Sequence, residues 1–278
     1  MTTTHSSAGN PRVSLTGYAT ASAWTHFGFE HAQWFSTLRG RALFLPLHLG
    51  CRALRRFAPG PGAFTETLYW RHHWFSEWAA RQCPGLAIEI GAGLSTRGIA
   101  HAARNPQMQW VDYDLPDMVH ARANMLASRD LPANYTLEPG DLLATGLGAQ
   151  LTAPSRGSVI AMTEGVTDYL NREEKQRAWQ SISSLLKRLG GGRYLLEIYP
   201  RDRIAAFGPA AGVVLDALRR ISGRDMLSQL CSSTDEAIGL LENNGFSRAR
   251  VLPESELADA GRAPPPSQRA FVLIEAQT

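Results

Sequence analysis

The sequence predicts an α/β fold, an open and mostly parallel seven-stranded sheet with helices on both faces and a helical cap ahead of it. Three observations predict this class. Short apolar runs alternate with stretches of helical composition from Gly85 onward. A glycine turn, Gly91 to Gly93, follows the first apolar run. Residues 1 to about 80 lack the alternation and are rich in aromatic residues and helix formers. The length of 278 residues suits one full-sized domain.

The predicted strands are short runs with apolar or alternating patterns. GLAIEI is apolar almost throughout, as expected for a strand buried on both faces. A loop around Pro264 to Pro266 joins the last two runs, which we expect to pair. In chain order the runs are GLAIEI (85–90), QMQWVDYDLP (107–116), NYTLEPGD (134–141), GSVIAMTEG (157–165), RYLLEIYP (193–200), FSRARVLP (246–253) and RAFVLIEA (269–276).

Helices are expected between these runs, and start and stop residues mark them. A first helix is expected over 94–104. Pro116 opens a second, which runs to about residue 129. A capping box of Asn171 with Glu174 opens a third, which ends at glycines 190–192. A similar box of Ser233 with Glu236 opens the last, which Gly245 ends.

The chain is expected to divide into a disordered tail (1–12), a helical cap or lid (13–80) and the α/β core (81–278). No apolar stretch approaches the roughly 20 residues of a membrane span, and the first residues do not resemble a signal peptide. Three scattered cysteines predict neither a disulfide framework nor a zinc site. The net charge of +3 is too small to indicate nucleic-acid binding. We expect a cytoplasmic protein without a metal.

The glycine turn is the first candidate ligand site. Gly91 and Gly93 allow the backbone to turn tightly after a strand, at the edge where α/β sheets bind ligands. In a dinucleotide fingerprint the third glycine would fall at Thr96. This substitution weakens the case for a pyrophosphate site.

Carboxylates end four consecutive predicted strands. Glu89 ends the first, Asp112 and Asp114 the second, Asp141 follows the third and Glu164 the fourth. Such a ring suits a cationic ligand with many hydroxyl and amino groups and repels phosphate. S-adenosylmethionine fits this description, with its ribose diol near the second strand. Asp112 and Asp114 share a strand face, so periodicity does not choose between them.

The motifs EIGAGLSTRG, VDYDLPDMVHAR, GDLL and TEGVTDYL, in this order, resemble the leucine carboxyl methyltransferase family and its polyketide O-methyltransferase relatives. The resemblance covers roughly residues 65–275 and implies a Rossmann-like class I methyltransferase fold. It implies that Gly91 and Gly93 border the methionine part of S-adenosylmethionine and that Asp114 holds the ribose. It further implies that Asp141 and Leu142 bracket the adenine and that Glu164 lies beside the cofactor. It implies that Arg71 binds the cofactor carboxylate. Ser95 and Asp168 depart from the family pattern.

The acceptor decides whether a general base is needed. A carboxylate is ionised at neutral pH, whereas a phenol with a pKa near 10 faces a deficit of roughly 4 kcal/mol. Candidate catalytic residues are His72 and His73, beside Arg71, and Asp168 and Tyr169, beyond Glu164. Glu197 and Tyr199 also end a strand near the expected substrate, with no motif behind them.

The sequence thus predicts an S-adenosylmethionine-dependent O-methyltransferase acting on a hydroxyl of a small aromatic or polyketide-like natural product. One alternative is a carboxyl methyltransferase that forms a methyl ester. Others are a nicotinamide-dependent oxidoreductase and a non-catalytic cofactor-binding subunit. Residues 31–65 contain five arginines and no Asp or Glu. They form either a solvated amphipathic helix or a basic lid for an anionic substrate or an acidic carrier protein.

Overall fold

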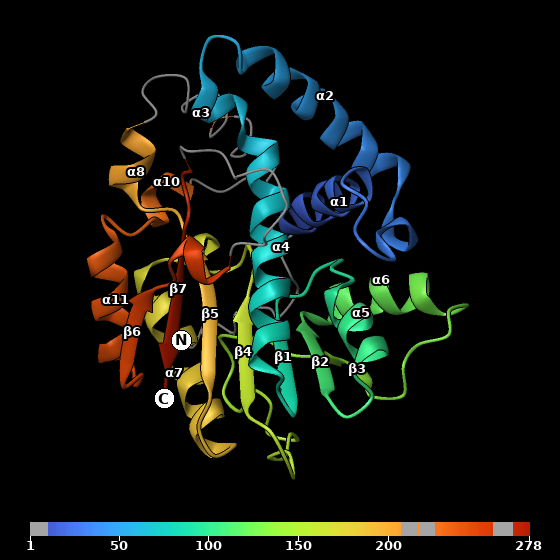
Figure 1. The fold of residues 1–278 in the computed structure, drawn as a ribbon, viewed down its shortest axis with the longest axis vertical. Coiled ribbons are helices and arrows are strands. Elements are labelled where there is room, and N and C mark those ends of the chain that lie inside the picture. The colour runs from blue at the N-terminus through green and yellow to red at the C-terminus, as the bar shows by residue number, and fades with distance from the viewer. Residues whose placement is uncertain (1–10, 207–215, 217–225, 258–268) are drawn as a thin grey trace, which may run out of the picture.

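The computed structural model describes residues 11–206, 216, 226–257 and 269–278. Residues 1–10 of the expected tail and the loop at Pro264 to Pro266 lie outside this part. A seven-stranded sheet in the order β3-β2-β1-β4-β5-β7-β6 forms the centre of the molecule (Figure 1). All pairs are parallel except those that β7 makes with β5 and β6. The strands are β1 Leu86–Ile90, β2 Gln109–Asp114, β3 Tyr135–Pro139, β4 Val159–Thr163, β5 Arg193–Ile198, β6 Arg248–Val251 and β7 Val272–Gln277.

Each predicted strand is present, so the predicted fold class is confirmed. The two strands predicted last form an antiparallel pair, with β7 between β5 and β6. The helices are α1 Pro11–His26, η1 Ala32–Phe35, α2 Leu38–Leu54, α3 Pro59–Gly62, α4 Phe64–Gln82, α5 Arg97–Arg104, α6 Pro116–Leu126, η2 Thr167–Tyr169, α7 Arg172–Arg188, α8 Arg201–Ala205, α10 Met226–Gln229, α11 Thr234–Asn243 and η3 Glu254–Glu256.

The two faces of the sheet have separate apolar cores, as the alternation of side chains along a strand requires. In β1, Leu86, Ile88 and Ile90 pack with side chains of α7 and α11. Ala87 faces the other way and packs with side chains of α4 and α5. Glu89 shares this second face, so its carboxylate points toward α5 rather than into solvent.

Helix α4 belongs to this second layer, although it lies in the segment predicted to be a cap. Trp74, Phe75 and Trp78 are buried in the same core as Ile160 and Leu195 of the sheet. In Figure 1, α4 crosses the sheet in front of β1 and β4, while α1 and α2 lie beyond one end of the strands. The cap is therefore joined to the core by a helix that is itself part of the sandwich.

Of the two predicted capping boxes, the one at α7 is complete and the one at α11 is half formed. At α7, the Asn171 side chain accepts from Glu174 N and the Glu174 side chain accepts from Asn171 N, so the box is complete. At α11, Ser233 accepts from Glu236 N, but the Glu236 carboxylate binds Ser232 instead. The predicted start of α5 at residue 94 is three residues early, because residues 91–96 form the turn.

Close packing of α5 on β2 depends on Gly98. A Cβ at Gly98 would lie 2.3 Å from Trp110 Nε1 and 2.9 Å from Asp112 Oδ1. Gly98 therefore allows the close packing of helix on strand that the third glycine of a dinucleotide fingerprint allows, although it lies two residues beyond that glycine's position.

We expect Gly98→Ala to lower the free energy of unfolding by about 2–3 kcal/mol, because α5 must move away from a fully buried tryptophan. Gly239→Ala is the matched control, since a Cβ at this helical glycine meets nothing within 4 Å. The control should gain about 0.5–1 kcal/mol from helix propensity. Urea unfolding of both variants measures the difference, and equal stability would show that α5 does not need this close approach.

Candidate functional site

The glycine turn after β1 is tied to β2 by its backbone. Gly91 N and Ala92 N both donate to Tyr113 O, at 2.7 and 3.1 Å. Gly91 has a φ of 70°, and a Cβ there would lie 2.4 Å from Val166 Cγ2. Gly93 also has a positive φ, of 54°, but a Cβ there would meet nothing within 4 Å. The turn thus needs glycine for packing at Gly91 and leaves open space beside Gly93.

Asp114 faces this turn from the end of β2. Its Oδ2 accepts from Gly93 N at 2.6 Å and its Oδ1 from Leu115 N at 2.7 Å. Burial raises the pKa of Asp114, and these two N–H groups oppose the shift. Each oxygen keeps a free acceptor direction, because the two bonds use one lone pair each. The carboxylate is therefore fixed in place and able to accept from the hydroxyls of a ligand.

Asp112 is occupied by the protein itself. Oδ1 accepts from Trp110 Nε1 at 2.7 Å, and Oδ2 accepts from Tyr135 OH at 2.8 Å and from Arg122, with both charged side chains fully buried. Arg122 also donates to Gly93 O at 2.9 Å. Asp114 therefore faces the turn, whereas Asp112 holds the arginine that supports it. A role of either acid in cofactor binding stays a prediction.

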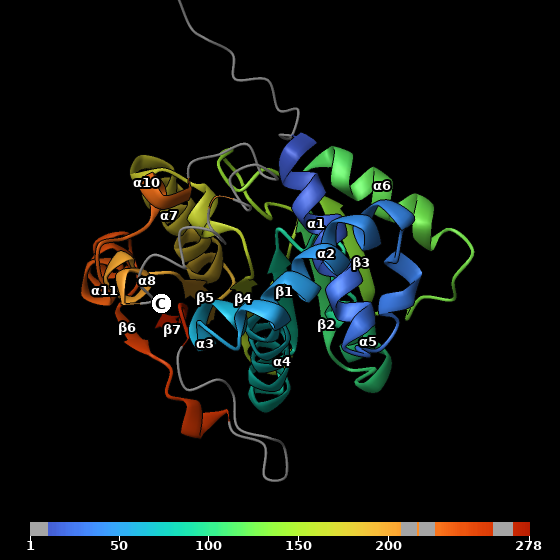
Figure 2. The ribbon, with the colours of Figure 1, turned by 90° about the horizontal axis from the view of Figure 1, so that it is seen from above.

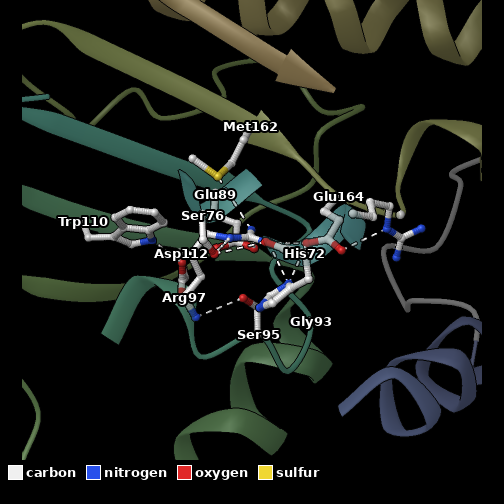
Figure 3. A network of polar contacts seen from close by, with 12 residues as sticks. His72, Ser76, Glu89, Gly93, Ser95, Arg97, Trp110, Asp112, Met162 and Glu164 are labelled. Carbon is white, nitrogen blue, oxygen red and sulfur yellow. Dashed lines mark hydrogen bonds and ion pairs between the residues drawn. The ribbon is translucent and has the colours of Figure 1, made fainter. Parts of the chain in front are cut away.

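The expected acidic ring needs correction, because buried arginines pair with three of its members, Glu89, Asp112 and Glu164. Arg97, at the start of α5, binds Glu89 Oε1 through Nη1 at 2.6 Å and binds Glu164 through Nη2 (Figure 3). Arg71 donates to Glu164 Oε1 from Nε at 2.9 Å. The sequence pattern shows the carboxylates at the strand ends but not which cations of the covering helices reach them. Asp114 and Asp141 are instead bound by backbone N–H groups, so only part of the ring is paired with cations.

Arg97 and Arg122 are the site residues that the sequence analysis missed. Each lies in the helix that follows its partner's strand, eight residues after Glu89 and ten after Asp112. A signal existed, since an arginine within a helix predicted to cover a strand-end acid can reach it. The spacing alone does not tell which helix face turns inward.

Glu164 is the centre of the network. Burial alone would raise the pKa of Glu164. The pKa nevertheless lies well below its ordinary value, because His72, Arg97 and Arg71 surround both carboxylate oxygens. His72 Nδ1 lies 2.8 Å from Glu164 Oε2 and 2.7 Å from Arg97 Nη2. Burial and the nearby Arg97 lower the pKa of His72 to about 4, so its ring is neutral at pH 7. Such an imidazole is a weak base and a good hydrogen-bonding link.

Arg71 connects this network to the end of β5. Its Nη1 donates to Tyr199 OH at 3.0 Å and lies 3.4 Å from Glu197 Oε1. The same Glu197 oxygen accepts from Gly165 N, and Oε2 has no hydrogen-bond partner within the described chain. Glu197 and Tyr199, which no motif supported, are therefore part of the site.

Burial raises the pKa of Glu197 to about 8 from 4.5, because Arg71 and Gly165 N compensate it only in part. The folded protein then keeps this proton where the unfolded chain releases it, so the contribution to stability is complete below pH 4.5 and is lost toward pH 8.

In the wild type, the raised pKa of Glu197 makes the free energy of unfolding fall as the pH rises from 5 to 8. We expect Glu197→Gln to reduce the slope of this fall by up to about 1.4 kcal/mol per pH unit. Urea unfolding at several pH values measures the slope. Glu173→Gln, at an exposed position of α7, serves as the control. Parallel curves for wild type and Glu197→Gln would contradict a protonated Glu197.

The remaining catalytic candidates also have partners. Asp168 Oδ2 accepts from Tyr199 N at 3.0 Å, and Oδ1 lies 3.6 Å from Lys175 Nζ, both groups being buried. Burial raises the pKa of Asp168 despite Lys175. Tyr169 OH donates to Thr16 Oγ1 at 3.4 Å. His73 stacks on the Tyr69 ring with centroids 5.7 Å apart. Of the four, His72 and Asp168 lie in the charged network.

Asp141 and Leu142 follow β3, on the other side of the glycine turn from Glu164. Asp141 Oδ1 accepts from Leu143 N at 2.8 Å, which caps the loop. Leu142 is buried in the core that includes Tyr113 and Ile90. Their roles beside adenine stay predictions.

The cap covers the start of α5. Thr96, the residue before α5, donates from Oγ1 to Glu30 O at 2.6 Å. Ser95 is buried, and its hydroxyl accepts from Arg97 N. The helix N-terminus, which binds pyrophosphate in dinucleotide sites, is therefore engaged by residues of the chain itself.

In the part of the chain that the structure describes, no group of three or more His, Cys, Asp and Glu side chains is arranged to hold a metal ion. None of the helices in that part is long and apolar enough to cross a membrane.

No protein-family model matches the sequence, and no curated protein matches it. Solved structures share its fold. A candidate methyltransferase from Thermobifida fusca is 14% identical, with 94% of each chain covered and a TM-score of 0.61. An O-methyltransferase family protein from Burkholderia thailandensis is 15% identical over 96% of this chain and 71% of its own, with a TM-score of 0.53.

PigF, solved with SAH, is 17% identical over 96% of this chain and 70% of its own, with a TM-score of 0.52. The chain spans only 59% of the length of a candidate O-methyltransferase from Nostoc punctiforme. At these identities the likeness is one of fold. The chain has the α/β fold seen in these methyltransferase structures, with a seven-stranded sheet whose one antiparallel strand is β7.

Proposed function

We propose that the protein is an S-adenosylmethionine-dependent methyltransferase that acts on an oxygen atom of a small molecule. The observation that carries the proposal is Asp114, fixed by Gly93 N and Leu115 N at the carboxyl end of β2, beside the open side of Gly93. An acid at this place can accept both hydroxyls of a ribose. The fold shared with PigF and the other methyltransferase structures supports this proposal.

We propose that different residues bind different parts of the cofactor. Asp114 would hold the ribose, and the backbone at Gly91 and Gly93 would border the methionine part. Asp141 and Leu142 would bracket the adenine. Bound S-adenosylmethionine supplies an electrophilic methyl group on a sulfonium. The chain's task is to align an acceptor oxygen with it and to exclude water.

Arg71 would bind the cofactor carboxylate. Its Nε and Nη1 are engaged by Glu164, Glu197 and Tyr199, whereas Nη2 has no hydrogen bond to any described residue. Nη2 lies 3.4 Å from where a Cβ of Gly165 would be. A guanidinium held on two sides and free on the third is well placed to bind an anionic oxygen.

A nicotinamide cofactor fits the site less well. The hydroxyl of Thr96 is bound to Glu30 O, so the start of α5 is covered by the cap. The sheet also differs from the all-parallel order of dinucleotide-binding folds, because β7 is antiparallel and lies between β5 and β6.

For the acceptor, a hydroxyl of an aromatic or polyketide-like metabolite is our first proposal. The neighbours described as O-methyltransferases support an oxygen acceptor. In this case a base must offset the roughly 4 kcal/mol needed to ionise a phenol at neutral pH. His72, His73, Asp168 and Tyr169 are the candidates.

One observation favours a second candidate, a carboxylate acceptor that yields a methyl ester. Three of the candidate bases have polar partners in the chain: His72 binds Glu164 and Arg97, Asp168 contacts Lys175, and Tyr169 binds Thr16. A carboxylate is already ionised and needs no base. The resemblance to leucine carboxyl methyltransferases supports this candidate as well.

The test is calorimetric titration of the protein with S-adenosylmethionine, S-adenosylhomocysteine and NAD, followed by methyl-transfer assays on matched phenols and carboxylic acids. We expect micromolar binding of the first two ligands and none of NAD. A product that is stable in mild alkali is an ether, and one that releases methanol is an ester. Binding of NAD alone would overturn the proposal, and cofactor binding without any methyl transfer would favour a non-catalytic subunit.

A further inference from the structure

The outward face of α2 exposes large apolar side chains. Leu38, Leu45 and Leu49 are 85%, 45% and 62% exposed, and Phe57, just beyond the helix, is 85% exposed. Spacings of seven and four residues place the three leucines on one side of the helix. The opposite side of α2 is buried through Phe44, His48 and Cys51. The helix therefore has two apolar faces, and only one of them is covered.

Arginines surround the exposed leucines. Arg41 and Arg52 lie on the same side of the helix as Leu45 and Leu49, and Arg39 and Arg56 are exposed nearby. Arg55 pairs with Glu66, but Arg39, Arg52 and Arg56 make no ion pair with any described residue. Residues 31–65 contain no Asp or Glu. The surface thus combines apolar anchors with uncompensated positive charge.

We propose that this face docks an acidic, helical protein domain that places apolar side chains between the arginines and carries the methyl acceptor. Charge complementarity selects this occupant. In a symmetric contact between two copies of this chain, arginines would meet arginines. A helix that lies in a membrane separates its charged side from its apolar side. On α2, Arg41 and Arg52 share the arc of the leucines, which suits a surface that offers both acidic and apolar groups.

The position of α2 relative to the site supports delivery of an acceptor. His48 Nδ1 lies 3.0 Å from Thr65 Oγ1, which joins the buried side of α2 to the first turn of α4. Farther along α4 are Arg71 and His72. Figure 2 shows α2 and α3 above the sheet, over the end at which the site lies. Delivery of the acceptor rests on the proposed methyl transfer, whereas docking itself does not.

The first experiment measures docking alone, by fluorescence anisotropy. The probe is a labelled helical peptide with leucine and glutamate on one face, and a scrambled peptide of the same composition is its control. We expect the patterned peptide to bind at least about tenfold more tightly, and added salt to weaken binding. Arg52→Glu with Arg56→Glu should weaken binding about tenfold or more, and Leu49→Ser about fivefold.

Matched variants test whether the effect belongs to α2. Arg156→Glu with Arg177→Glu changes two exposed arginines elsewhere, and Leu131→Ser changes another exposed leucine. Both should leave binding unchanged. Equal binding of the two peptides, or equal weakening by the control variants, would overturn the proposal in favour of unspecific charge attraction. Tighter binding to vesicles of anionic phospholipid, or self-association that Leu49→Ser abolishes, would overturn it in favour of a membrane or a second copy.

The second experiment concerns delivery. The same acceptor is offered free and linked to the patterned peptide, and methyl transfer is measured by product mass. Arg52→Glu with Arg56→Glu should raise the KM of the linked acceptor about tenfold and leave the free acceptor unchanged. If neither acceptor is methylated while the peptide still binds through α2, the proposed acceptor class fails and docking stands. If both are methylated equally well and the variant changes neither, docking for delivery fails.

Discussion

Replacing Asp114 with asparagine is expected to weaken the binding of S-adenosylmethionine about 100-fold. Such a loss corresponds to about 2.7 kcal/mol, which matches the value of a hydrogen bond to a charged group. The carboxylate is held from two sides by Gly93 N and Leu115 N, so it presents its remaining lone pairs in a fixed direction. Asparagine keeps the size but replaces one acceptor oxygen with a donor. Titration calorimetry measures the dissociation constant.

Two controls separate binding from folding. Asp117→Asn changes an exposed acid in the first turn of α6 and should leave affinity unchanged. Thermal unfolding of Asp114→Asn checks that the turn between β1 and α5 still forms. An unchanged dissociation constant in a stable Asp114→Asn variant would remove Asp114 from the cofactor site and with it the observation on which the proposed function rests.

The strands and the glycine turn could be predicted from sequence because they depend on local pattern. The apolar run at the start of β1 and the positive φ of Gly91 and Gly93 are consequences of neighbouring residues. The capping box at Asn171 is likewise local. The third close glycine was not predictable in this way. A glycine is needed at position 98 because Trp110 of β2 packs against it. This contact depends on how α5 packs on β2 and not on the residues next to Gly98 in the sequence.

The polar network likewise depends on contacts between residues that are far apart in the sequence, which a local pattern does not predict. The acids could be placed at one edge of the sheet because parallel strands end together. The partners of Glu164 could not, because Arg71 and His72 reach it across 93 and 92 residues. The charge balance of the site is therefore a property of tertiary structure. A count of strand-end acids overestimates the negative charge that a ligand meets.

Arg97→Ala is expected to have the largest effect on stability. The Arg97 side chain is fully buried and joins Glu89 and Glu164, with further bonds to His72 and Ser76. Its loss leaves Glu89 without a cation in contact, whereas Glu164 keeps Arg71. Breaking a buried ion pair by removing one partner costs about 3–5 kcal/mol. For a chain of this size the melting temperature should fall by roughly 10 °C.

Arg104→Ala is a matched control in the same helix. Arg104 pairs with Glu30 at the surface, with its side chain 62% exposed, and its loss should cost less than about 1 kcal/mol. Glu89→Gln should cost less stability in the Arg97→Ala background than in the wild type, because the Arg97 side chain that donates to Glu89 Oε1 is already gone. Additive effects of the two changes would mean that Arg97 and Glu89 do not act as a pair.

The pH dependence gives a second readout that packing loss alone would not change. In the wild type, His72, Arg97 and Arg71 outweigh burial and hold the pKa of Glu164 well below 4.5, so its contribution to stability is present above pH 4.5 and is lost as pH falls through the lower folded pKa. Arg97→Ala raises that pKa. The variant should therefore lose stability in acid at a higher pH than the wild type, and the gap between them should narrow as Glu164 becomes protonated in both. A gap that stays constant from pH 7 to pH 3 would assign the cost of the substitution to lost packing around Phe75, over whose ring the guanidinium lies, and not to the ion pairs.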